Sequence, residues 1–170
     1  MSAAPVVWVT GLPGAGKSTF GARLAAALRA RGTPCALLDG DEVRAALGRP
    51  PGAGPAERDG FYAALSRLAT LLALQGITVV VASTAHRAAY RHRARELAPR
   101  FVEVYVATSL DVCRRRDPRA LYRRALAGEA HDVPGIDVTY ELPSAPDVVA
   151  TGGEDVAALE RALELAVSEG

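Results

Sequence analysis

A single lysine stands within a glycine-rich segment near the start of the chain, and its type and place suggest phosphate chemistry. The 170-residue sequence has 20 basic residues, and since Lys17 is its only lysine, the other 19 are arginines. A compact ammonium fits where the broad planar guanidinium does not, so a position that keeps lysine has a reason to do so. Chance retention of one lysine is the alternative, and the neighbouring residues decide between the two.

The residues around Lys17 have the spacing of a phosphate-binding loop (P-loop). Residues 11–18 read Gly-Leu-Pro-Gly-Ala-Gly-Lys-Ser and fit the pattern G-x-x-x-x-G-K-[ST] after a short apolar run. Such glycines let backbone N–H groups converge on phosphate oxygens, and a helix that begins here adds its dipole. A chance glycine-rich turn would not explain the position of the only lysine. The predicted ATP-binding residues of this loop are Gly11, Leu12, Pro13, Gly14, Ala15, Gly16, Lys17, Ser18 and Thr19.

Within this loop, two side chains have distinct predicted tasks. Lys17 would neutralise the β- and γ-phosphates of a bound nucleotide, and the Ser18 hydroxyl would bind Mg²⁺.

Two carboxylates, Asp39 and Asp41, follow the apolar run at residues 36–38. Ligands of open α/β sheets gather where strands end, so this pair is placed to hold Mg²⁺ through water and to orient an acceptor hydroxyl. Helix capping is a second explanation, since Asp41 could cap the helix that follows, and we expect it to hold for one of the two carboxylates. P-loop enzymes that hydrolyse nucleotide for mechanical work usually end a later strand with a carboxylate, whereas the run at residues 77–82 is followed by serine and threonine. The pattern therefore favours a small kinase.

An arginine-rich stretch covers residues 114–119 and continues through Arg123 and Arg124. A charge run of this kind is often a solvated helix face. After a strand and helix of a P-loop kinase it is also typical of a lid, whose guanidinium groups close over phosphates and stabilise transition-state charge. Both interpretations remain open for any single arginine, and the lid is favoured for the segment.

The remaining residues predict the elements that position these groups. Short apolar runs predict strands at residues 6–10, 36–38, 77–82, 101–106 and 148–149. Helical spacing predicts helices at residues 18–28, 41–47, 56–74, 86–97, 111–124 and 154–167. The proline-bearing segments 49–55 and 131–146 are predicted loops. Strands that alternate with helices predict one α/β domain over residues 1–170, with a parallel sheet covered on both faces.

Composition excludes several other classes of protein. The chain is 49% hydrophobic and 23% charged with a net charge of +1, which excludes intrinsic disorder and gives no sign of a nucleic-acid partner. No apolar run is long enough to span a membrane. The two cysteines, Cys35 and Cys113, are far apart and are predicted to be reduced thiols, so a cytoplasmic location is expected. The three histidines have no metal-ligand spacing, so no metal beyond Mg²⁺ is predicted.

Taken in order, the motifs resemble the adenylylsulfate (APS) kinase family over nearly the whole chain. The matching residues are Gly11–Thr19, Leu37–Asp41 with Val43 and Arg44, Arg58, Phe101–Val106, Cys113 with Arg116–Pro118, Leu121–Tyr122, Ala127–Glu129, and Gly135–Asp137 with Tyr140, Glu141 and Pro143. The resemblance implies an α/β P-loop kinase fold with a five-stranded parallel sheet flanked by helices and a basic lid. It also implies ATP and Mg²⁺, and a small-molecule acceptor whose hydroxyl takes the phosphoryl group, which in APS is the ribose 3′-OH. A homodimer is a further implied partner, although no residue marks an interface.

Roles carry over from the family by position. Asp39 resembles the catalytic aspartate and, through water, a Mg²⁺ ligand beside Ser18, with Lys17 and Arg116 completing the predicted catalytic set. Arg116 and Arg119 resemble lid positions near ATP. Thr84 takes the place of a serine after the third strand. The predicted substrate-binding residues are Asp41, Glu42, Arg44, Arg58, Phe61 and Thr84.

Departures from the family gather on the acceptor side. Glu42 and Phe61 stand where the family has asparagine, and Ala63 stands where it has arginine. Ala53 and Val133 replace two phenylalanines that enclose the APS adenine, and such stacking contributes roughly 1–3 kcal/mol per base. The expectation is therefore an acceptor other than APS: a nucleoside, sugar or specialised metabolite, contacted through Glu42 and Phe61. The alternatives are a true APS kinase, a non-catalytic nucleotide-binding regulator and, for Phe61 alone, a place in the core.

Overall fold

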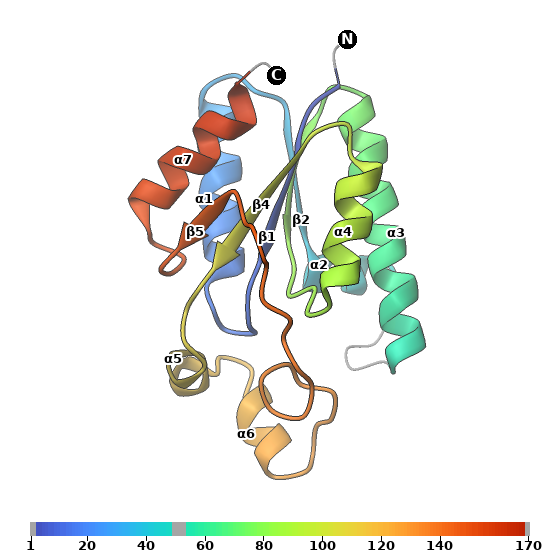
Figure 1. Cartoon of the computed structure of the whole chain (residues 1–170), viewed down its shortest axis with the longest axis vertical. Helices are drawn as coiled ribbons and strands as arrows, with labels where there is room; N and C mark the ends of the chain where they lie inside the picture. The colour runs from blue at the N-terminus through green and yellow to red at the C-terminus, as the bar shows by residue number, and fades with distance from the viewer. Residues whose placement is uncertain (1–2, 49–53, 169–170) are drawn as a thin grey trace.

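The computed structural model describes residues 3–48 and 54–168, and it contains one parallel sheet of five strands in the order β2-β3-β1-β4-β5 (Figure 1). The predicted α/β fold with a five-stranded sheet is confirmed. The strands are β1 (Val6–Thr10), β2 (Cys35–Asp39), β3 (Thr78–Ala82), β4 (Phe101–Val106) and β5 (Val148–Ala150). The helices are α1 (Lys17–Ala30), α2 (Gly40–Ala46), α3 (Pro55–Leu74), α4 (Ala88–Leu97), α5 (Leu110–Arg116), α6 (Leu121–Leu126) and α7 (Val156–Val167).

Hydrophobic clusters cover both faces of the sheet. Val7 and Val9 of β1 pack in the cluster that includes residues of α1 and α7, whereas Val6 and Trp8 pack in the cluster that includes residues of α3 and α4. All four side chains are at most 1% exposed, which explains why the strand is continuously apolar instead of alternating. Among the described residues, the indole N–H of Trp8 is the one buried side-chain polar atom without a hydrogen-bond partner.

The predicted helix over residues 111–124 is wrong, because α5 ends at Arg116 and α6 begins at Leu121. Pro118 lacks an N–H, and its ring would clash with a carbonyl of the preceding turn, so one continuous helix is excluded. Asp117 leaves helical geometry (φ 21°) and accepts hydrogen bonds from the N–H groups of Tyr122 and Arg123, at 3.0 Å each. Asp117 therefore directly follows α5, and its carboxylate accepts hydrogen bonds from N–H groups in the first turn of α6.

The other predicted elements are present, with ends displaced by one to two residues at most positions. We call residues 110–138, which include α5 and α6, the lid; they lie below the sheet's carboxyl edge in Figure 1. Part of the predicted loop at residues 49–55, including Ala53, lies outside the described residues. None of the helices in the described chain has the length and apolar character needed to cross a membrane.

Candidate active site

Because all five strands are parallel, the segments that carry the predicted site leave the sheet at one edge. β2 and β3 lie on one side of β1, and β4 and β5 lie on the other side. Open α/β sheets form a ligand crevice at the point where the strand order reverses in this way. The phosphate loop (residues 11–18) follows β1, Asp39 ends β2, and Thr84 comes two residues after β3. Three neighbouring strands therefore bring together residues that are distant in sequence.

Gly16 shows why the phosphate loop needs glycine at its end. Its φ is 104°, in the left-handed region, and a Cβ on this residue would lie 2.7 Å from the backbone nitrogen of Gly153. No side chain fits between these two backbones. The β5–α7 loop, which sequence reasoning did not assign to the site, therefore packs against the phosphate loop, and Arg23 donates to the Gly153 carbonyl at 3.1 Å.

The Lys17 ammonium is held within the phosphate loop. Its Nζ donates a hydrogen bond to the Leu12 carbonyl at 2.8 Å. Burial lowers the pKa of Lys17 to about 8, even though the nearby carboxylates of Asp41 and Asp39 act to raise it. The protein therefore brings the loss of this positive charge close to physiological pH.

Ser18 and Asp39 meet directly. The Ser18 hydroxyl donates to Asp39 Oδ2 at 2.5 Å, while Asp39 Oδ1 accepts from the backbone N–H of Asp41 at 3.0 Å. Asp39 is thus the N-cap of α2, so one of the two carboxylates does cap the helix as expected, although it is Asp39 and not Asp41. Asp39 is 9% exposed, and these two hydrogen bonds fix its largely buried carboxylate.

The Ser18 and Asp39 oxygens suit Mg²⁺, which prefers oxygen ligands and keeps several waters. Within the described residues no cluster of three or more His, Cys, Asp or Glu side chains could hold a metal ion by itself. The residues present therefore fit a magnesium ion whose shell is completed by water and phosphate, as is usual at kinase sites.

The lid reaches α2 through an ion pair between Arg119 Nη1 and Asp41 Oδ2, at 2.7 Å. Both side chains are more than half exposed, so the pair itself contributes only about 0–1 kcal/mol. The ion pair is informative because of its position, since it joins two of the predicted site residues, one on the lid and one on α2. Arg116 is exposed and has no ion pair among the described side chains.

On the acceptor side, the Arg44 guanidinium lies 3.8 Å from the centre of the Phe61 ring. Phe61 is 1% exposed and belongs to the core, as the structural alternative proposed. The expectation that Phe61 contacts the acceptor directly therefore does not fit its burial, and its contribution is to support Arg44. Arg58 donates to the Asp132 carbonyl at 2.6 Å and lines a small cavity of about 60 Å³ between α3, α4 and the lid.

The other acceptor-side positions differ in accessibility. Glu42 is exposed on α2, and Thr84 is half-buried with its carbonyl hydrogen-bonded to Thr10. Val133 is 2% exposed and packs in the core, so it presents no surface for stacking a base. Ala53, the other position of the missing aromatic pair, lies outside the described residues.

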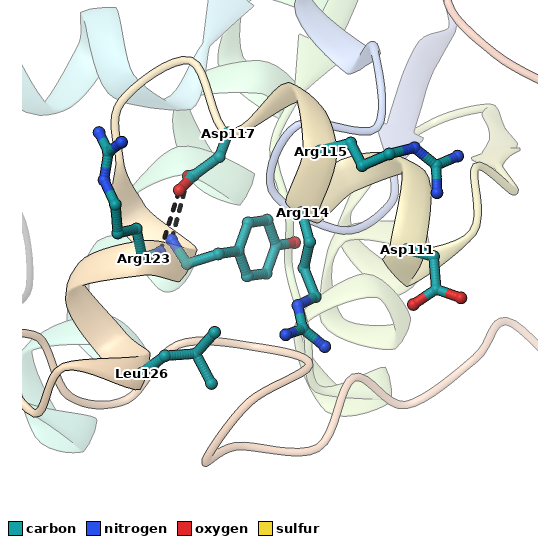
Figure 2. A pocket seen from close by; sticks show the side chains of 7 residues that line it. Asp111, Arg114, Arg115, Asp117, Arg123 and Leu126 are labelled. Carbon is teal, nitrogen blue, oxygen red and sulfur yellow. Dashed lines mark hydrogen bonds between the residues drawn. The ribbon is translucent and has the colours of Figure 1, made fainter.

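The outer face of the lid carries a hollow of about 480 Å³ between α5 and α6 (Figure 2). Its lining residues are Asp111, Arg114, Arg115, Asp117, Tyr122, Arg123 and Leu126. On the opposite side of α5, Cys113 faces the backbone of Gly14, so this part of the lid packs on the phosphate loop. Tyr122 strengthens that contact, because its hydroxyl donates to the Pro13 carbonyl at 2.6 Å. No sequence motif assigned Tyr122 this role.

A parallel sheet with a phosphate loop after its central strand, a carboxylate after the neighbouring one and an arginine-bearing lid defines a P-loop kinase. The family model of adenylylsulphate kinase matches residues 3–151, and the chain belongs to this family. It is a phosphotransferase that acts on a hydroxyl group.

Three similar proteins carry the name of the same family. The adenylyl-sulfate kinase of Vibrio cholerae is 44% identical over 151 residues, which cover 88% of this chain and 70% of that protein. A probable bifunctional SAT/APS kinase of Sorangium cellulosum is 42% identical over 150 residues, but the chain spans only 26% of its length. A structure of the APS kinase CysC of Mycobacterium tuberculosis in complex with AMPPNP and APS is 37% identical, with a TM-score of 0.86 and 96% of both chains covered. All three proteins carry APS, also called adenylyl sulfate, in their names.

Proposed function

We propose that this protein transfers the γ-phosphoryl group of MgATP to the ribose 3′-OH of APS. The similarity to adenylyl-sulfate kinases favours APS over the other acceptors that the sequence suggested. The observation that carries the transfer itself is the contact between Ser18 and Asp39 beside the Lys17 ammonium, at the carboxyl edge of the sheet. A phosphate-binding cation, a magnesium-type oxygen pair and a carboxylate near the reacting hydroxyl are the parts that phosphoryl transfer requires.

On the donor side, backbone N–H groups of the phosphate loop and Lys17 bind the β- and γ-phosphates. Ser18 would hold Mg²⁺ directly and Asp39 would hold it through water, and the ion would offset charge on the phosphate oxygens. Arg116 and Arg119 approach from the lid and stabilise charge as the phosphoryl group moves. Arg119 has to leave Asp41 to do so, which its exposure permits.

Phosphoryl transfer makes one bond and breaks one. The acceptor oxygen forms a bond to the γ-phosphorus while the bond from that phosphorus to the bridging oxygen breaks, and ADP leaves. The hydroxyl proton moves to the Asp39 carboxylate, which then releases it to solvent. The two hydrogen bonds that hold Asp39 keep its carboxylate at one place during this step.

Arg44 and Arg58 bind the anionic part of the acceptor. Guanidinium groups match phosphate and sulfate oxygens with paired hydrogen bonds, so two arginines on neighbouring helices α2 and α3 suit the phosphosulfate of APS. Packing on the Phe61 ring restrains Arg44 before the acceptor arrives. Because less side-chain freedom is then lost on binding, a restrained arginine binds more tightly than a free one.

A different hydroxyl acceptor is the second candidate function, and the specific observation in its favour is Val133. With Val133 buried in the core, this position offers no aromatic face to an adenine base. The exposed carboxylate of Glu42 would favour an acceptor that carries an amine over a doubly anionic one.

Acceptor-dependent release of ADP decides between these candidates. We expect MgATP with APS to give turnover well above the rate with nucleosides, sugars or aminoalcohols. Each rate is compared with the rate without acceptor, which measures simple ATP hydrolysis. Turnover with another alcohol and none with APS would contradict the proposal, and no acceptor-dependent ADP at all would support a nucleotide-binding regulator.

The affinity for ATP should fall as pH rises above about 8. Lys17 is charged below its pKa of about 8 and neutral above it, and the nucleotide phosphates favour the charged form. The dissociation constant for a non-hydrolysable ATP analogue should therefore be nearly flat from pH 6.5 to 7.5 and rise above pH 8, by up to about tenfold per pH unit. Calorimetric titration measures it, and Lys17→Met, which has no titrating amine, should abolish the rise.

A further inference from the structure

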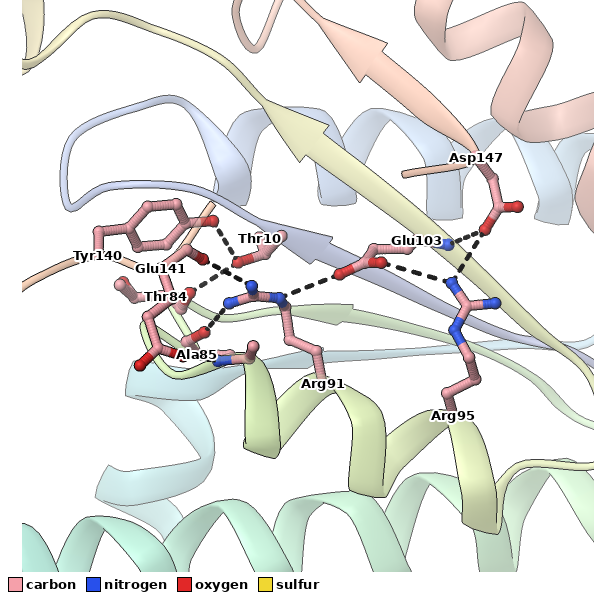
Figure 3. Close-up of polar contacts among 10 residues, drawn as sticks. Thr10, Thr84, Ala85, Arg91, Arg95, Glu103, Tyr140, Glu141 and Asp147 are labelled. Carbon is pink, nitrogen blue, oxygen red and sulfur yellow. Dashed lines mark hydrogen bonds and ion pairs between the residues drawn. The ribbon is translucent and has the colours of Figure 1, made fainter. Parts of the chain in front are cut away.

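A buried arginine on α4 has every one of its guanidinium nitrogens hydrogen-bonded (Figure 3). Arg91 is 2% exposed. Its Nε donates to Glu103 Oε1 at 3.0 Å, Nη1 to the Ala85 carbonyl at 2.5 Å and Nη2 to the Glu141 carbonyl at 2.6 Å. Burial of a charge is costly unless the charge is paired and its donors are satisfied, and Arg91 meets both conditions.

The three acceptors of Arg91 belong to three separate parts of the chain. Glu103 lies on β4, Ala85 lies in the acceptor loop (residues 83–87) beside Thr84, and Glu141 lies in the return segment (residues 139–142) that leads out of the lid. Two more hydrogen bonds hold the return segment, one to the acceptor loop and one to Ala88, the first residue of α4. The Glu141 N–H donates to the His86 carbonyl at 2.8 Å, and the Ala88 N–H donates to Glu141 Oε2 at 2.6 Å.

Hydroxyl groups extend this network to the phosphate loop. Thr10 Oγ1 donates to the Thr84 carbonyl at 2.7 Å and lies 2.8 Å from the Tyr140 hydroxyl. A hydroxyl has one proton, and that of Thr10 is used on the carbonyl, so Tyr140 must be the donor to Thr10. Thr10 ends β1 and directly precedes Gly11, so the return segment, the acceptor loop and the phosphate loop meet at one side chain.

We propose that Arg91, Tyr140 and Thr10 are positioning residues for phosphoryl transfer. They hold the acceptor loop and the return segment at fixed positions relative to the start of the phosphate loop. Neither Arg91 nor Tyr140 has to touch substrate. Each acts through the backbone of residues that border the site, where small displacements of the reacting groups strongly reduce rate. The kinetic part of this proposal rests on the proposed function, and the structural part does not.

A purely structural role for Arg91, as the partner of Glu103, is the alternative. The chain contains a matched control in Arg95, one turn further along α4. Arg95 also contacts Glu103, at 3.4 Å, and Asp147, at 3.4 Å, but it has no hydrogen bond to the acceptor loop or to the return segment. Loss of an ion pair between α4 and β4 is therefore common to both variants, whereas loss of positioning belongs to Arg91 alone.

Hydrogen exchange of backbone amides tests the structural part without any substrate. In Arg91→Met we expect faster exchange at Glu141 and Ala88, whose N–H groups tie the return segment to the acceptor loop and to the start of α4, and unchanged exchange in α7. Arg95→Met should exchange at the wild-type rate at both amides. If Arg91→Met fails to fold, Thr10→Val takes its place, because valine has the shape of threonine and removes only the hydroxyl; Thr10→Ser keeps the hydroxyl. Unchanged exchange in the folded Arg91 or Thr10→Val variant overturns the proposal.

Kinetics test the positioning role. We expect kcat/KM for APS to fall by about tenfold or more in Arg91→Met, Thr10→Val and Tyr140→Phe, while the dissociation constant for the ATP analogue stays within about threefold. Arg95→Met should match the wild type in both measurements. An equal loss in Arg95→Met would reduce Arg91 to a structural residue. If the wild type itself does not turn over APS, the proposed function fails, and hydrogen exchange still decides the proposal.

Discussion

Lys17→Ala is expected to lower kcat/KM with MgATP by about a thousandfold, which is the scale seen when one preorganised contact to transition-state charge is removed. The ammonium is already placed in the phosphate loop by its hydrogen bond to the Leu12 carbonyl. Alanine leaves no positive charge there for the β- and γ-phosphates. Steady-state ADP release with saturating acceptor measures the effect.

Lys17→Arg is the informative partner of this variant. It keeps the charge but replaces a compact ammonium with a broad guanidinium in a loop that closes around it. We expect it to be nearly as inactive as alanine, with a thermal midpoint close to the wild type in both variants. Near-normal activity of Lys17→Arg would show that charge alone is sufficient and would remove the chemical reason for the only lysine in the sequence.

Asp39→Asn should cripple turnover, by roughly 10²–10⁴-fold, and leave ATP binding largely intact. Asparagine can keep both observed contacts, since its Oδ1 can accept from the Asp41 N–H and its Nδ2 can donate to the Ser18 hydroxyl. The cap of α2 is therefore retained. What is lost is the negative charge and the ability to take the acceptor proton.

Single-turnover phosphoryl transfer and calorimetric titration of the ATP analogue measure the two properties separately. Asp111→Asn, an exposed carboxylate that lines the outer hollow of the lid, controls for the loss of one negative charge. Undiminished turnover in Asp39→Asn would eliminate Asp39 as the proton acceptor.

The fold was predictable because the central strands are buried on both faces and are rich in β-branched residues, as residues 6–10 and 78–82 show. The break in the lid helix was missed because the helical spacing of residues 111–124 continues through Pro118, although proline excludes an uninterrupted helix there.

The site was predictable only where chemistry is concentrated in a motif. Lys17 and Ser18 belong to one loop, and Asp39 ends the strand that the pattern identified. The network around Arg91 was not predictable, because Thr10 and Tyr140 are 130 residues apart and most of the contacts are to backbone carbonyls. Every residue has a backbone carbonyl, so the pattern of side chains does not show which carbonyls accept these hydrogen bonds. Phe61 shows the converse, since its type suggested a ligand contact and its burial assigns it to the core.

The lowered pKa of Lys17 also makes this side chain suitable for selective covalent labelling. Amine-reactive reagents attack the uncharged amine, and a pKa of about 8 leaves about one tenth of Lys17 uncharged at pH 7, far more than an ordinary lysine. Lys17 is also the only side-chain amine in the sequence. Acylation followed by peptide mapping therefore reports a single side-chain event, at Lys17, separately from any reaction of an α-amino group, whose ordinary pKa is also about 8. Protection from it by a nucleotide reports occupancy of the phosphate loop without any label or acceptor.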